Sequence, residues 1–221
     1  MDERMNFYQE LMNSLSAKAV TLVAVSKIQP LEKIRELYAI GHRDFGENYV
    51  QELVDKAAQL PDDIRWHFIG HLQSNKVRQV IPFSYLIQGV DSFRLLKEID
   101  KQAGKAGRKT DCLLQVFISG EETKFGLDSQ ELQTILLGEE LKTLQHINIR
   151  GLMGMASFSD DKEKVEKEFR FLKSLFDTYR DKFTGAPILS MGMSDDYQLA
   201  IANGSNMVRI GSLLFGARAK K

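Results

Sequence analysis

Lys27 stands where its amine could act as a nucleophile, at the end of the apolar, β-branched run that covers residues 20–26. A lysine in this position either extends into solvent or holds its amine at the mouth of a pocket. In a partly desolvated pocket the pKa of a lysine falls, and the neutral amine can form a Schiff base with an aldehyde. Lys27 is therefore a candidate for the covalent capture of an aldehyde.

Two segments near the C-terminus have the composition of a phosphate site. MGMSDD (191–196) and RIGSLLFG (209–216) each follow a strand-like run. Backbone N–H groups and hydroxyls of Ser194, Gly211 and Ser212 could bind an anion there without steric obstruction. The two aspartates that follow Ser194 would repel a phosphate, so more contacts are expected from Gly211 and Ser212. The alternative is that both serines are ordinary helix N-caps.

Arg209 is the first residue of the second of these segments and lies just before its glycine and serine. An aldehyde that carries a phosphate and reaches Lys27 would be pyridoxal phosphate. Arg209 could then donate a hydrogen bond to the pyridine nitrogen and leave it unprotonated, because arginine keeps its proton. A ring in that state is a weaker electron sink for carbanion chemistry. The alternative is a salt bridge between Arg209 and a carboxylate such as Glu47.

Strand-like and helix-like segments alternate along the whole chain. Such alternation is typical of parallel strands joined by right-handed helical crossovers. The eight expected strands are 20–26, 42–47, 65–70, 84–90, 111–118, 148–155, 187–192 and 206–211.

The clearest helical pattern covers residues 160–183. Asp160, followed by Glu163, predicts a capping box at its start. Asn203 and Gly204 are expected to close a later helix that begins near Ser194, with the glycine just past the last turn. The apolar residues of the segment 160–183 are spaced by four, three, four, three and four positions, which places them on one face of a helix. They are Val165, Phe169, Leu172, Phe176, Tyr179 and Phe183.

Eight strand–helix units in a chain of 221 residues predict a (β/α)₈ TIM barrel of small size. We expect a single α/β domain over residues 1–221, with an extra amphipathic helix over residues 3–17. In this fold the chemistry lies at the C-terminal ends of the strands, where the residues named above fall. The competing architecture is an open doubly wound sheet, but no glycine-rich loop follows the first strand.

Composition narrows the class of protein. Lysine plus arginine and aspartate plus glutamate both number 30, which gives no overall attraction to nucleic acid or to a membrane surface. The single cysteine, Cys112, excludes an internal disulfide framework and is expected in a buried strand. The first residues resemble no secretory signal, and no apolar run is long enough to span a bilayer, so a cytoplasmic location is expected. The four histidines lack metal-ligand spacing, so no metal is expected.

Seven segments of the chain resemble the pyridoxal phosphate homeostasis protein family. They occur in the family's order and cover the chain nearly from end to end, which makes the resemblance far more specific than any one motif. The matching segments are VAVSK (23–27), GENYVQE (46–52), WHFIGHLQSNK (66–76), TKFG (123–126), GLMGMA (151–156), LSMGMSDD (189–196) and VRIGSLLFGAR (208–218).

The resemblance implies a fold-type III barrel like the N-terminal domain of alanine racemase, and it implies roles for individual residues. The cofactor lysine matches Lys27, the pyridine-nitrogen arginine matches Arg209, the phosphate site matches Ser194, Gly211 and Ser212, ring-side positions match Asn48 and Met155, and a lysine of cofactor exchange matches Lys124.

The resemblance also implies a carrier rather than an enzyme. Family members hold pyridoxal 5′-phosphate as a Schiff base, buffer it, and are thought to pass it to apo-enzymes that need it. The chain ends shortly after the expected eighth strand, so we expect no racemase-type second domain to supply a base across the ring, and we expect a monomer. The alternatives are an amino-acid racemase or decarboxylase with the same cofactor, and a cofactor-free barrel that binds another phosphate ester.

Overall fold

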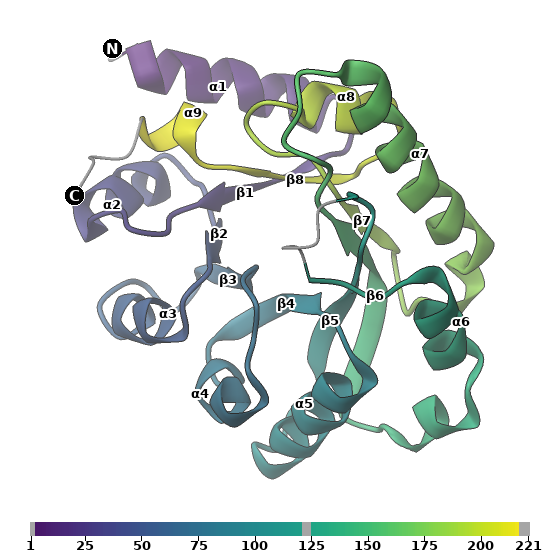
Figure 1. The fold of residues 1–221 in the computed structure, drawn as a ribbon. Helices are drawn as coiled ribbons and strands as arrows, with labels where there is room; N and C mark the ends of the chain where they lie inside the picture. The colour runs from purple at the N-terminus through teal and green to yellow at the C-terminus, as the bar shows by residue number, and fades with distance from the viewer. Residues whose placement is uncertain (1–2, 121–124, 217–221) are drawn as a thin grey trace.

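The computed structural model describes residues 3–120 and 125–216 and contains a closed parallel barrel. The strands lie around the ring in chain order, with helices on the outside (Figure 1). The expected TIM barrel is therefore confirmed, and every expected strand forms. The strands are β1 (Thr21–Val25), β2 (Asp44–Glu47), β3 (Arg65–Phe68), β4 (Ser84–Val90), β5 (Thr110–Val116), β6 (Ile147–Gly154), β7 (Ile188–Ser190) and β8 (Met207–Ile210).

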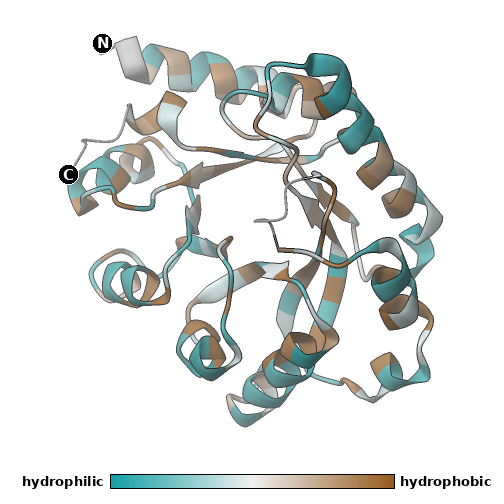
Figure 2. Ribbon diagram, in the orientation of Figure 1, coloured by the Kyte–Doolittle hydropathy of each residue, from teal (hydrophilic) through white to brown (hydrophobic). Residues whose placement is uncertain are grey.

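The helices alternate with these strands and carry both hydrophilic and hydrophobic residues (Figure 2). The α-helices are α1 (Glu3–Ser16), α2 (Leu31–Ala39), α3 (Val50–Ala57), α4 (Val77–Val80), α5 (Phe93–Lys105), α6 (Ser129–Leu137), α7 (Lys162–Thr178), α8 (Tyr197–Ala202) and α9 (Ser212–Phe215). Short 3₁₀ turns cover Ser74–Lys76, Glu139–Thr143 and Arg180–Lys182. In the described residues, no helix has the length and apolar character needed to cross a bilayer.

Alternation along each strand separates the interior of the barrel from the layer beneath the helices. On β1, Leu22 and Ala24 belong to the large core between strands and helices, whereas Val23 belongs to a small cluster inside the barrel. β1 closes the ring by pairing with β8, with Val23 opposite Arg209. The first and last strands therefore lie side by side, which brings the candidate site residues of both together.

The helix expected over residues 160–183 is shorter than predicted and has a different cap. Asp161, not Asp160, is the N-cap, and its carboxylate accepts hydrogen bonds from the backbone of Glu163 and Lys164 at 3.1 Å. The prediction was one residue off because either aspartate lies close enough in sequence to reach the first turn. The α-helix ends at Thr178 and a 3₁₀ turn follows it.

Three other local predictions hold, although the helix expected to begin near Ser194 begins at Tyr197. The extra N-terminal helix covers Glu3–Ser16, and its Tyr8 is buried against the start of β2, where its hydroxyl contacts Nδ1 of His42 at 3.1 Å. Gly204 follows α8 with φ of 95°, in the left-handed region that suits glycine after a helix. Cys112 is fully buried on β5.

Candidate functional site

Lys27 lies in a turn directly after β1 and is half-buried. Ile28, the next residue, has φ of 63°, a left-handed conformation that β-branched residues rarely adopt. Its backbone N–H donates to the carboxylate of Glu52 at 2.5 Å. This conformation costs free energy and persists only where surrounding contacts hold it. The turn that carries Lys27 is therefore held in place by contacts with other elements, such as the one with Glu52 of α3.

Lys56 of α3 connects the contacts that hold this turn. Its ammonium donates to the backbone carbonyl of Ser26 at 2.6 Å, to Glu47 at 2.8 Å and to Glu52 at 2.6 Å. The Ser26 hydroxyl also donates to Glu47, at 2.6 Å. Ser26 and Ile28 flank Lys27. The cluster of Lys56, Glu47 and Glu52 therefore holds the backbone in place on both sides of the candidate nucleophile. Sequence reasoning missed Glu52 and Lys56, although Glu52 lies within the GENYVQE segment.

Burial raises the pKa of Glu47 to about 7, and the neighbouring Lys56 only partly offsets this effect. A buried acid with a raised pKa holds its proton more tightly in the folded chain than in the unfolded chain. The free energy of unfolding therefore falls as pH rises from about 4.5 to about 7, by up to about 3 kcal/mol.

We expect Glu47→Gln to flatten this pH dependence, because glutamine has no proton to release while its carbonyl oxygen can still accept from Ser26 and Lys56. Urea unfolding of both proteins at several pH values between 4 and 8 measures the difference. Parallel curves for the two proteins would show that Glu47 does not titrate in this window.

Two hydrogen bonds join the candidate phosphate segments after β7 and β8, and one of them runs from the backbone N–H of Arg209 to the Gly192 carbonyl at 3.0 Å. The backbone N–H of Gly211 donates to the Ser194 hydroxyl at 3.3 Å. A Cβ at Gly211 would lie 3.3 Å from both Cβ and the carbonyl oxygen of Val25, so this segment runs close to the end of β1. The N-cap interpretation of the serines is wrong, since Asp196 and Gly211 hold the N-cap positions of α8 and α9.

Arg209 is buried inside the barrel with 4% of its surface exposed. Its guanidinium donates to the Ser190 hydroxyl at 2.5 Å and to the Gly154 carbonyl at 3.0 Å. Burial lowers the pKa of Arg209 to about 10, against the favourable field of Asp196, so the group stays charged at neutral pH. The alternative partner, Glu47, is bound to Lys56 instead. The hydrogen bonds to Ser190 and Gly154 use two N–H groups of the guanidinium and leave others for a ligand.

Asn48 and Met155 follow β2 and β6 and complete the residues expected beside a ring. Among the described residues, Oδ1 of Asn48 is buried without a hydrogen-bond partner. Buried acceptors are rarely left unpaired, so this atom could accept a hydrogen bond from a ligand. Met155 is partly buried against the small cluster inside the barrel. Lys124 lies outside the described residues. An orphaned acceptor, a retained guanidinium charge and a glycine–serine segment fit an aldehyde that carries a phosphate.

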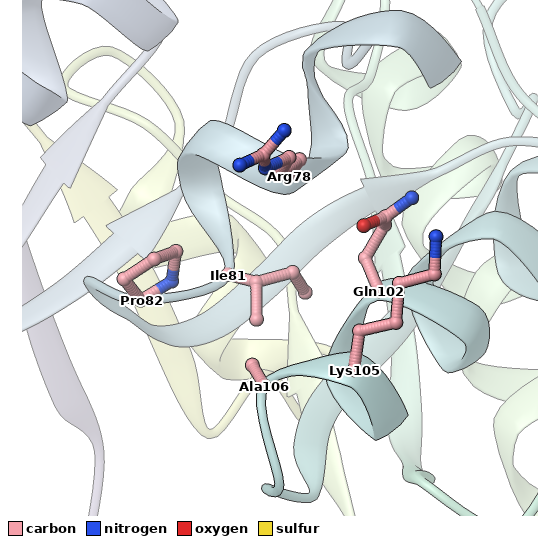
Figure 3. Close-up of a pocket in the computed structure, with 6 residues that line it drawn as sticks. All are labelled: Arg78, Ile81, Pro82, Gln102, Lys105 and Ala106. Atoms are coloured by element: carbon pink, nitrogen blue, oxygen red, sulfur yellow. The ribbon is translucent and has the colours of Figure 1, made fainter.

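Two cavities lie away from these residues. One, of about 440 Å³, lies between α4 and α5 and is lined by Arg78, Gln102 and Lys105, among others (Figure 3). It opens at residues that precede β4 and β5, at the end of the barrel opposite the candidate site. The other, of about 400 Å³, follows β3 and β4 and includes His71 and Asp91. Over the described residues, no group of histidine, cysteine and acidic side chains could hold a metal ion.

Comparison with known proteins identifies the family. The sequence profile of the alanine racemase N-terminal domain matches residues 6–219. A pyridoxal phosphate homeostasis protein of Aquifex aeolicus is 41% identical over 199 residues, covering 89% of this chain and 86% of the relative.

Two solved structures of PipY from Synechococcus elongatus PCC7942 are each 38% identical and cover 94% of this chain and 99% of their own. The structure without pyridoxal phosphate has a TM-score of 0.86, and the one with pyridoxal phosphate bound has a TM-score of 0.83. This chain belongs to the pyridoxal phosphate homeostasis protein family, within the larger group defined by the N-terminal domain of alanine racemase.

Proposed function

We propose that this protein binds pyridoxal 5′-phosphate and carries or buffers it as part of cellular vitamin B6 homeostasis, as a single domain over residues 1–221. One observation carries the proposal: three neighbouring strands, β7, β8 and β1, each end in one part of the expected site. β7 ends near Ser194, β8 carries Arg209 and leads into Gly211, and β1 leads into Lys27. Aldehyde, pyridine nitrogen and phosphate would each meet a suitable group.

In this proposal Lys27 holds the aldehyde covalently, since its amine condenses with the carbonyl carbon with loss of one water. Arg209 donates to the pyridine nitrogen, and Ser194, Gly211 and Ser212 bind the phosphate. In the same proposal, Asn48 and Met155 lie beside the ring, and Lys124 assists cofactor exchange. The pyridoxal phosphate bound to PipY supports this reading, because PipY is 38% identical to this chain.

The proposed role is non-catalytic. A guanidinium with a pKa of about 10 remains a hydrogen-bond donor at neutral pH, so it does not give the ring a proton. The cofactor then withdraws electrons less strongly than a protonated ring would, which slows carbanion chemistry. The names of the homeostasis relatives agree with this role.

The test loads purified protein with pyridoxal phosphate, reduces it with borohydride and maps the labelled peptide. Label on Lys27 is the expected result, and a protein that cannot be loaded would overturn the proposal. A second arm follows the exchange of α-protons in a panel of amino acids in deuterated water. Turnover of about 1 s⁻¹ or faster would favour a racemase or decarboxylase instead.

Apolar side chains around the mouth of the barrel support delivery of the cofactor to apo-enzymes. Ile28, Tyr49, Phe125, Met193 and Leu213 are all more than a third exposed, and each follows a different strand. We propose that a cytoplasmic monomer presents this rim to recipients. Loaded protein should reactivate an apo-enzyme faster than an equal concentration of free pyridoxal phosphate, and Tyr49→Ser should remove part of that advantage.

A further inference from the structure

A continuous chain of hydrogen bonds crosses the barrel interior from Arg209 to Asp44. Arg209 donates through Nη1 to the Ser190 hydroxyl at 2.5 Å, and Ser190 donates to Oε1 of Gln88 at 2.7 Å. Nε2 of Gln88 contacts Nδ1 of His67 at 3.0 Å, and Nε2 of His67 contacts Oδ1 of Asp44 at 3.0 Å. The five residues come from β8, β7, β4, β3 and β2.

The residues of this hydrogen-bond chain are all buried. Ser190, Gln88 and His67 have no exposed surface, and Asp44 is 8% exposed. Apolar side chains usually fill the interior of a (β/α)₈ barrel, and burial of polar groups costs free energy unless they are hydrogen-bonded. Here every link between the two charged ends is made. The interior therefore contains a complete polar network where simple packing would need only apolar side chains.

The direction of every hydrogen bond follows from the two ends. A guanidinium only donates, so the Ser190 oxygen accepts from Arg209 and its single proton goes to Gln88. The amide nitrogen of Gln88 only donates, so Nδ1 of His67 must accept. The His67 proton is therefore on Nε2, where it is donated to Asp44. All donors point from Arg209 towards Asp44, which makes the chain one ordered unit.

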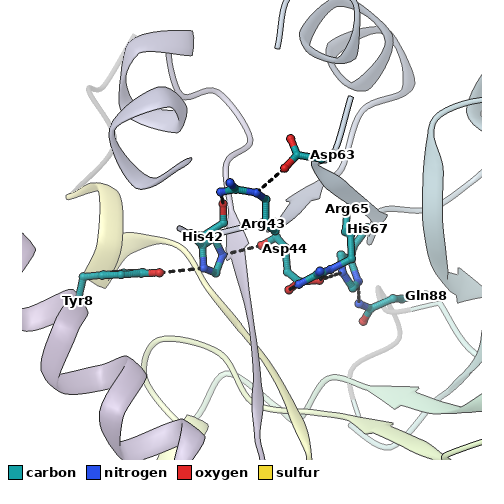
Figure 4. Close-up of polar contacts among 8 residues, drawn as sticks. All are labelled: Tyr8, His42, Arg43, Asp44, Asp63, Arg65, His67 and Gln88. Carbon is teal, nitrogen blue, oxygen red and sulfur yellow. Dashed lines mark hydrogen bonds and ion pairs between the residues drawn. The ribbon is translucent and has the colours of Figure 1, made fainter. Parts of the chain in front are cut away.

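The hydrogen-bond chain ends at Asp44, at the start of β2, where further contacts hold this carboxylate in place (Figure 4). Arg65 donates to both carboxylate oxygens of Asp44, at 2.8 and 2.5 Å. These contacts, with that from His67, hold the pKa of Asp44 well below its usual range despite burial. His42 contacts the Asp44 carbonyl at 2.8 Å and links it to Tyr8 of α1. Asp44 is thus a charged and fixed acceptor.

We propose that Gln88 and His67 are positioning residues that hold the Arg209 guanidinium in one orientation as the donor to the pyridine nitrogen of the cofactor. Neither residue needs to touch the cofactor, because each acts through Ser190. This inference rests on the proposed function for its purpose, whereas the ordered chain itself can be tested without any cofactor.

The cofactor-free test uses nitrogen-15 NMR of the histidine side chains in the protein without pyridoxal phosphate. The His67 resonances are expected to show a proton on Nε2 alone. In Gln88→Glu, His67 would face an acceptor on each nitrogen and should therefore hold both protons. A wild-type His67 with its proton on Nδ1, or a tautomer that does not respond in Gln88→Glu, would overturn the ordered chain.

The cofactor test compares Gln88→Met with Gln115→Met, using pyridoxal phosphate labelled with nitrogen-15 in the ring. Methionine nearly conserves the volume of glutamine but cannot bridge Ser190 and His67. Gln115 on β5 is also buried, with 4% of its surface exposed, and its amide donates to the Phe125 carbonyl at 2.7 Å and takes no part in the hydrogen-bond chain. Gln88→Met should weaken binding by about fivefold to tenfold and shift the ring-nitrogen resonance, whereas Gln115→Met should leave that resonance in place.

Failure of the proposed function can be distinguished from failure of the positioning role. If wild-type protein binds no pyridoxal phosphate, the proposed function fails while the tautomer result stands on its own. If the wild type binds and a folded Gln88→Met gives the same affinity and the same ring-nitrogen resonance, the positioning role is wrong. Far-ultraviolet circular dichroism and urea unfolding establish that both variants are folded, and Ser190→Ala, which removes the direct partner of Arg209, should reproduce the resonance shift if Gln88→Met does not fold.

Discussion

Lys27→Ala is expected to abolish covalent capture of pyridoxal phosphate and to weaken its binding by about a hundredfold, or ~2.8 kcal/mol. The variant keeps Arg209 and the phosphate segments but loses the amine that bonds to the aldehyde. Lys27 lies in a turn and is only half-buried, so the fold should survive. The measurements are the visible absorption of the loaded protein, borohydride labelling and equilibrium binding.

Lys76→Ala is the matched control, since Lys76 is an exposed lysine that also follows a barrel strand. It should load and label like the wild type. Continued labelling of Lys27→Ala on another lysine would show that the nucleophile has been assigned to the wrong residue. Unfolding of Lys27→Ala would show instead that Lys27 supports the core rather than the mouth of the barrel.

Gly151→Ala is expected to have the largest effect on stability, a loss of about 4 kcal/mol or complete failure to fold. Gly151 lies within β6 with φ of 149°, and an added Cβ would lie 1.9 Å from the carbonyl oxygen of Ile188 on β7. That oxygen belongs to backbone, so only a shift of one strand against the other relieves the clash. Urea unfolding measures the loss against a total stability of roughly 5–15 kcal/mol for typical domains.

Gly107→Ala separates the steric effect from the conformational effect. Gly107 has φ of 65°, but a Cβ there would meet nothing within 4 Å. Its replacement should therefore cost only about 1 kcal/mol, from the left-handed backbone alone. Equal losses for the two variants would argue against the close approach of β6 and β7 at Gly151.

Strand positions were predictable because apolar runs alternate with amphipathic segments and because each run is short. The contacts at the ends of helices and strands were less predictable. Asp160 and Asp161 are chemically equivalent, and only backbone geometry decides that Asp161 caps α7. Ser194 has the residue type of an N-cap, yet its hydroxyl accepts from Gly211, a contact made when the ends of β7 and β8 come together.

The candidate site was predictable where one residue type suggests one chemistry. Lys27 at a strand end and Arg209 before a glycine–serine segment are of this kind. The supporting residues were not predictable, because their roles depend on contacts between distant segments. Lys56 resembles any helical lysine until α3 packs beside Ser26, and Gln88 becomes a link to Arg209 only when the barrel closes.

The pairing of β1 with β8 has a consequence for synthesis of the protein. Lys27 leaves the ribosome long before Arg209, which lies opposite Val23 in the closed ring. A nascent chain or a fragment that lacks β8 has no complete ring and should retain no coenzyme. Contacts so far apart in sequence also form slowly, so coenzyme uptake would report that β8 has been translated and that the ring has closed.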